Sequence, residues 1–78
     1  MATKLTDIPD GTRLRITGFE QTSRYSDHLC RLGLVPGTEV TVVRRAPLGD
    51  PLEIRLRGYS LALRPSEAID LVFEIIAP

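Results

Sequence analysis

The sequence predicts a mainly-β, all-β-class domain: a small, partly open barrel of five short strands with one short helix. Three observations predict it. Several segments alternate apolar and polar residues, tight-turn residues separate these segments, and only one segment has helical spacing. The 78 residues leave room for one domain, and 42% hydrophobic with 26% charged residues is an ordinary globular composition. We therefore expect residues 1–78 to form a single domain.

The first strand and the helix come from the N-terminal half of the chain. Leu14 and Ile16 alternate with polar neighbours after a turn that contains proline and glycine. The helix is expected to begin near Ser23, a good N-cap, and to end at Gly33, which supplies a left-handed C-terminal cap. Its apolar face consists of Tyr25, Leu29 and Leu32.

The second and third strands are predicted to pair with their apolar faces together. The residues expected to face inward are Val40, Val42, Ala46, Leu52, Ile54 and Leu56. Matching these faces places Val42 opposite Leu56 and Arg45 opposite Glu53, a favourable cross-strand charge pair. Arg44 has the inward parity, so we expect it near a rim of the barrel.

The last two strands follow from a second turn and a second alternating run. Residues 58–59 fit a two-residue type II′ loop with glycine first, which pairs Leu56 with Leu61 and Ile54 with Leu63. After a single helical turn, the final strand is expected to direct inward Ile69, Leu71, Phe73 and Ile75.

Composition and reactive side chains argue against several function classes. Zero net charge disfavours a dedicated nucleic-acid or membrane-surface binder. His28 and Cys30 are two residues apart on the predicted helix and point to different faces, so we expect no specific metal site, and no cofactor is predicted. One histidine and no nucleophile framed by a base argue against an enzyme. The single cysteine fits a reducing cytoplasm, and the longest apolar run, residues 69–77, is too short to insert into a membrane.

Two segments concentrate turn-forming and apolar residues, and they are the predicted partner-binding sites. The first contains Leu32, Gly33, Leu34, Pro36 and Gly37, and its Pro-Gly pair suits a type II turn. The second contains Ala46, Pro47, Leu48, Gly49, Asp50 and Pro51. Prolines restrict the residues before them, so this loop would lose little entropy on binding, with Leu48 as apolar anchor and Asp50 as polar neighbour. The alternative is that the loop only closes a hairpin and Leu48 packs under the barrel.

The chain also resembles the ferrous iron transport protein A (FeoA) family of bacteria over almost its whole length. The matching residues are Leu29, 32–34, 36–37, Val40, Val42, 46–51, 57–58, 61–64 and 67–68. The resemblance implies an SH3-like barrel with a helix inserted after the first strand. It implies a cytoplasmic accessory protein that docks onto the cytosolic part of the ferrous iron transporter, a membrane protein with a GTP-binding domain. A detached SH3-like domain of a metal-dependent transcriptional repressor is the alternative, and a small barrel that binds single-stranded nucleic acid is a weaker one. The oligomeric state stays open.

Overall fold

The computed structural model describes residues 5–47 and 51–77 and contains one antiparallel sheet. The elements in chain order are a 3₁₀ helix (Leu5–Asp7), β1 (Arg13–Phe19), α1 (Arg24–Arg31), β2 (Glu39–Arg45), β3 (Leu52–Leu56), β4 (Tyr59–Leu63) and β5 (Leu71–Ala77). The sheet order is β4-β3-β2-β1-β5, so β4 and β5 are its two edges. The predicted mainly-β class, with five strands and one short helix, is confirmed.

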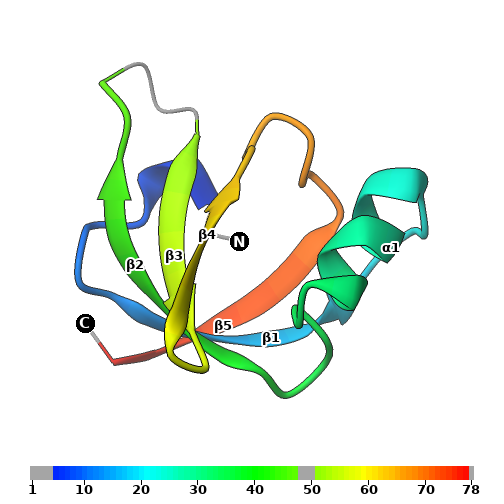
Figure 1. Cartoon of the computed structure of the whole chain (residues 1–78), viewed down its shortest axis with the longest axis horizontal. Helices are drawn as coiled ribbons and strands as arrows, with labels where there is room; N and C mark the ends of the chain where they lie inside the picture. The colour runs from blue at the N-terminus through cyan, green and yellow to red at the C-terminus, as the bar shows by residue number, and fades with distance from the viewer. Residues whose placement is uncertain (1–4, 48–50, 78) are drawn as a thin grey trace.

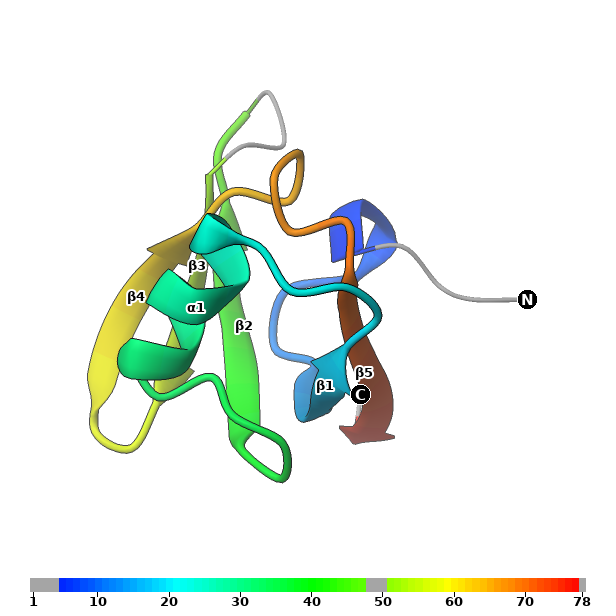
Figure 2. The same ribbon diagram turned by 90° about the vertical axis from the view of Figure 1, so that its right-hand side faces the viewer.

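The sheet curves around a small apolar core, and α1 lies across the open side between β4 and β5 (Figures 1 and 2). Every strand and the helix contribute to this core, whose ten most completely buried side chains are Ile8, Leu14, Ile16, Leu29, Leu34, Val42, Leu52, Ile54, Leu56 and Leu63. Such burial is the main stabilising term for a chain of this size. It also stabilises α1, which at eight residues is too short to be stable alone.

Helix α1 has the caps that the sequence predicts. The Ser23 Oγ accepts a hydrogen bond from the Ser26 N–H at 3.1 Å, and the Ser26 Oγ accepts one from the Ser23 N–H at 2.7 Å. This reciprocal pair satisfies two backbone donors at the helix start. At the other end Gly33 has a φ of +112°, the left-handed conformation expected after a helix C-terminus.

The pairing of β2 with β3 corrects two expectations. Val42 lies opposite Ile54 rather than Leu56, and Glu53 lies opposite Arg44 rather than Arg45. The reason is a register shift between Val42 and Arg44, where one extra residue bulges out of β2. Because side chains alternate along a strand, this insertion exchanges the sides of the two arginines. Arg44 is exposed, and Arg45 is half-buried.

The loop between β3 and β4 also differs from the expected one. Residues 57–58 form it, with a φ of +48° at Arg57 and +85° at Gly58. Two positive φ values are typical of a type I′ turn, whose twist matches that of the flanking strands. Leu56 therefore pairs with Tyr59 rather than with Leu61. The observed pairing of β3 with β4 is shifted by two residues from the predicted one. The same residues therefore face inward, but each lies opposite a different residue of the other strand.

Strand β5 begins later than expected. Ile69 is 77% exposed and precedes the strand, and Ile75 within it is 49% exposed, so the predicted inward direction is wrong for both. Leu71 is buried and Phe73 is half-buried against the core, as expected. Two register shifts in the pairing with β1 interrupt the simple alternation.

Candidate docking surface

The structure places the two predicted partner-binding segments at opposite ends of β2 (Figure 1). The Pro36–Gly37 turn comes just before this strand, and Ala46 comes just after it. Seven residues of extended strand span roughly 20 Å. The two segments therefore do not form one continuous surface, and each has to be judged separately.

The first segment is largely structural. Leu34 is 0% exposed, so its side chain belongs to the core and is not available to a partner, which corrects its assignment as a contact residue. A Cβ at Gly33 would stand 2.9 Å from the Tyr59 hydroxyl, which explains why this position has no side chain. Leu32 is half-buried. Only Pro36 and Gly37 are exposed, in a turn closed by the Thr38 N–H donating to the Val35 carbonyl at 3.0 Å.

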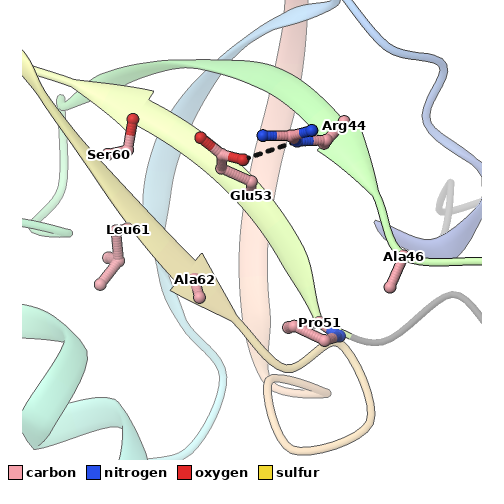
Figure 3. Close-up of a pocket in the computed structure, with 7 residues that line it drawn as sticks. All are labelled: Arg44, Ala46, Pro51, Glu53, Ser60, Leu61 and Ala62. Carbon is pink, nitrogen blue, oxygen red and sulfur yellow. Dashed lines mark hydrogen bonds and ion pairs between the residues drawn. The ribbon is translucent and has the colours of Figure 1, made fainter.

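The second segment lies beside a groove. Leu48, Gly49 and Asp50 fall outside the described residues. Pro47 is exposed, and the Ala46 N–H donates to the Pro51 carbonyl at 3.1 Å, which closes the base of the loop. Ala46 and Pro51 line a groove of about 350 Å³ together with Arg44, Glu53, Ser60, Leu61 and Ala62 (Figure 3). That volume is in the range of sites that accept a ligand group or a side chain.

Three of the groove residues come from β4 and were not predicted as site residues: Ser60, Leu61 and Ala62. The sequence shows that this strand lacks charged residues, and the structure adds that it is largely exposed. Of the five strands in the described ranges, β4 is the one with no charged residue, although its residues Ser60 and Ala62 are exposed. An exposed strand without charges is unusual, because sheet edges commonly carry them.

One ion pair lies at one side of the groove. The Arg44 Nε donates to the Glu53 Oε1 at 2.9 Å (Figure 3). This hydrogen bond is the main cause that lowers the pKa of Glu53 below the ordinary glutamate value, with a smaller contribution from the Ser60 hydroxyl.

We expect the substitution Arg44→Gln to raise the pKa of Glu53, measured by an NMR pH titration of its side-chain carboxyl. In the wild type, a lowered folded-state pKa means that the pair stabilises the fold above the unfolded-state pKa and stops doing so as the pH falls through the folded-state value. Arg13→Gln is the matched control, because Arg13 pairs with Glu39 elsewhere. If the pKa of Glu53 did not change in Arg44→Gln, the hydrogen bond from Arg44 would not be the main cause of the lowered pKa.

A second group of charges lies across β5, β1 and β2. The Arg15 guanidinium contacts Glu74 at 2.7 Å and Glu39 at 3.4 Å, and Arg13 contacts Glu39 at 3.0 Å. The hydrogen bond to Glu74 is the main cause that raises the pKa of Arg15. Since carboxylates compensate these arginines, this face lacks the uncompensated basic surface that binds a phosphate backbone.

The described residues contain no cluster of three or more His, Cys, Asp or Glu side chains that could hold a metal ion. His28 and Asp27 are exposed on α1, and Cys30 is half-buried. No helix within residues 5–47 and 51–77 has the length and apolar character needed to cross a membrane.

Residues 3–73 match the sequence model of the FeoA domain. The chain belongs to the FeoA domain family. A curated relative from Porphyromonas gingivalis is an Fe(2+) transport protein A/Fe(2+) transporter FeoB fusion protein, 30% identical over 74 residues, which are 95% of this chain and 9% of that protein. This chain thus spans a small fraction of the fusion.

Solved structures of FeoA proteins have the same fold. Iron(II) transport protein A from Clostridium thermocellum has a TM-score of 0.85 and 32% identity, over 95% of this chain and 46% of that one. FeoA from Stenotrophomonas maltophilia, complexed with zinc and described as an SH3 domain protein, has a TM-score of 0.75 and 30% identity, over 94% of this chain and 91% of that one. The predicted SH3-like fold is confirmed. IdeR from T. acidophilum, at 17% identity and a TM-score of 0.78 over 34% of its chain, shares the fold alone.

Proposed function

We propose that this FeoA chain is a cytoplasmic, non-enzymatic accessory protein of bacterial ferrous iron uptake that docks onto the cytosolic part of the ferrous iron transporter. The observation that carries the proposal is the fusion protein, in which a domain 30% identical to this chain is part of the same polypeptide as the transporter FeoB. A covalent link keeps two domains at high effective concentration, which is useful where they act together.

The groove beside residues 46–51 is the docking surface we assign. It combines apolar lining from Ala46, Pro51 and Leu61 with a polar pair, Arg44 and Glu53, at one side. Apolar contacts supply affinity, and a few placed polar groups supply orientation. Pro47 and Pro51 each have a fixed backbone φ angle, which lowers the entropy that these two residues lose on docking.

The test compares one substitution at each end of β2. Pro51→Arg places a long charged side chain in the groove, and we expect it to weaken binding to the purified transporter at least about tenfold, or about 1.4 kcal/mol. Pro36→Arg is the matched control, since Pro36 is an exposed proline in the turn at the opposite end. Binding is measured by biolayer interferometry on the transporter in detergent micelles.

Two results would contradict this proposal. Absence of binding by the wild type would overturn the docking function, and a larger loss in Pro36→Arg than in Pro51→Arg would move the surface to the other end of β2. If the accessory biases the nucleotide-driven cycle of the transporter, its affinity must differ between the GTP-bound and GDP-bound forms, because a ligand shifts an equilibrium only through such a difference.

The alternative function, a detached domain of a metal-dependent repressor, receives no specific support beyond the shared fold with IdeR. Capture of a DNA-binding protein in place of the transporter from the same cells would favour it.

A further inference from the structure

Strand β4 presents an open edge. It pairs with β3 on one side and with no strand on the other within the described chain. Strand β4 lies nearest the viewer in Figure 1 and forms the left-hand boundary of the molecule in Figure 2. Ser60 and Ala62, in the middle of the strand, are exposed.

The register shows which backbone groups this edge offers. A two-residue loop closes on a hydrogen-bonded pair, here Leu56 and Tyr59, so the ladder hydrogen bonds of β4 come from Tyr59, Leu61 and Leu63. The N–H and C=O groups of Ser60 and Ala62 therefore point away from β3. No other group of residues 5–47 and 51–77 forms a hydrogen bond with them. Their spacing of two residues is the one at which an added strand forms its bonds.

Both ends of β4 are held in place by α1. The Arg64 N–H, just beyond the strand, donates to the Tyr25 hydroxyl at 2.8 Å. At the start of the strand, the Tyr59 hydroxyl donates to the Leu32 carbonyl. An edge fixed in its extended conformation loses little entropy when a segment pairs with it.

This edge lacks the usual protection against pairing. Natural edge strands commonly carry charges, prolines or bulges that prevent unwanted association. The other edge, β5, has such features, because it carries Glu74 and two register shifts. Strand β4, with the sequence Tyr-Ser-Leu-Ala-Leu, has neither charge nor proline, and its pairing with β3 is regular. The two edges therefore differ: β5 carries features that prevent pairing, and β4 does not.

The charges around β4 indicate the kind of segment that fits. Residues 52–63 contain two arginines, Arg55 and Arg57, and one acidic residue, Glu53, which Arg44 already pairs. Arg55 lies directly opposite Ser60, and Arg57 lies in the adjoining loop, both of them exposed. The groove lined by Leu61 and Ala62 lies beside the same strand. An incoming strand is therefore favoured when it carries acidic side chains.

We propose that β4 is a docking edge onto which a partner protein adds an extended acidic segment as a further strand, bonded to the backbone of Ser60 and Ala62. This inference deepens the proposed function and rests on it for the identity of the partner, since the edge and the groove form one surface. The backbone bonds provide affinity that does not depend on sequence, and the arginines with the groove provide selectivity.

A peptide tests this edge without the transporter. The probe is a nine-residue peptide of alternating valine and glutamate, and the same peptide with lysine in place of glutamate is the control. In NMR spectra of the full chain, we expect the acidic peptide to shift the amide resonances of Ser60 and Ala62 and to slow their hydrogen exchange, while the lysine peptide does neither. Shifts confined to other residues would overturn the proposal.

The key variant is Ala62→Pro, which removes one outward N–H donor and no ladder bond of β4. Proline is tolerated at edge positions of this kind, and Ala62→Val is the control that keeps the donor. We expect Ala62→Pro to weaken the acidic peptide at least about tenfold and Ala62→Val to bind like the wild type. Equal binding of the two variants would overturn the proposal.

A second pair of variants covers the case in which Ala62→Pro fails to fold. Ala62→Glu and Ala62→Lys add side chains of similar length and opposite charge, so only the first should repel the acidic peptide. If Ala62→Glu and Ala62→Lys changed the affinity for the acidic peptide equally, the inference that the incoming segment is acidic would be overturned. Sedimentation that shows the wild type pairing with itself through β4, with no response to peptide, would identify a second copy as the occupant and overturn the proposal as well.

The same variants separate this inference from the proposed function. A transporter that binds wild type and Ala62→Pro equally overturns the docking edge and leaves the accessory function standing. A transporter that binds neither overturns the accessory function, while the peptide result still decides the edge.

Discussion

Replacing Leu34 by alanine is expected to lower the free energy of unfolding by about 2 to 5 kcal/mol, the cost of removing a large side chain from a closed core. Leu34 is 0% exposed and lies in the same cluster as Leu29 and Leu56. A domain of this size loses roughly 4 to 8 °C of melting temperature for each kcal/mol. Thermal melts followed by circular dichroism should therefore show a fall of at least about 8 °C.

The neighbouring leucine provides the control for this prediction. Leu32 is half-buried at the end of α1, so Leu32→Ala removes less buried surface and should cost clearly less stability. If Leu34→Ala instead melted like the wild type and lost affinity for the transporter, Leu34 would be a docking residue after all and its place in the core would be wrong.

Replacing Arg45 by methionine is expected to lower the free energy of unfolding by about 1.5 to 3 kcal/mol, because hydrogen bonds to a charged donor are lost. The Arg45 Nη2 donates to the Leu5 carbonyl at 3.2 Å and to the Ile8 carbonyl. Its Nε atom is buried and has no partner among the described residues, and the residue as a whole is half-buried. These bonds hold the N-terminal segment against β2. We expect faster amide hydrogen exchange across residues 5–12 in the variant.

Arg44→Met is the matched control, since it changes the adjacent arginine in the same way. Arg44 is exposed and its ion pair with Glu53 lies at the surface, where such pairs contribute at most about 1 kcal/mol. Equal losses in the two variants, or a larger loss in Arg44→Met, would contradict the bulge that assigns the two arginines to opposite sides of β2.

The candidate docking surface could be predicted from the sequence only in part. Its loop residues, Ala46 and Pro51, were predicted because proline and glycine mark a rigid turn. The β4 residues Ser60 and Ala62 were not, because neither of them carries chemistry of its own. What they offer is the backbone, and whether a backbone group is free depends on strand order and register. A local pattern of side chains does not contain that information.

Local features of the sequence determined the mainly-β class, the Ser23 cap, the Gly33 helix end and the inward residues of β3. Each of these depends on nearest neighbours: side-chain alternation, a hydroxyl at a helix start, or a glycine where φ is positive. Only the tertiary structure decided the burial of Leu34, the exchange of Arg44 with Arg45, and the open edge at β4. The burial of Leu34 and the open edge depend on which elements lie next to each other in the fold. The exchange of the arginines depends on how many residues β2 and β3 place opposite each other, and one bulged residue in β2 reverses their sides without any change in the local sequence pattern.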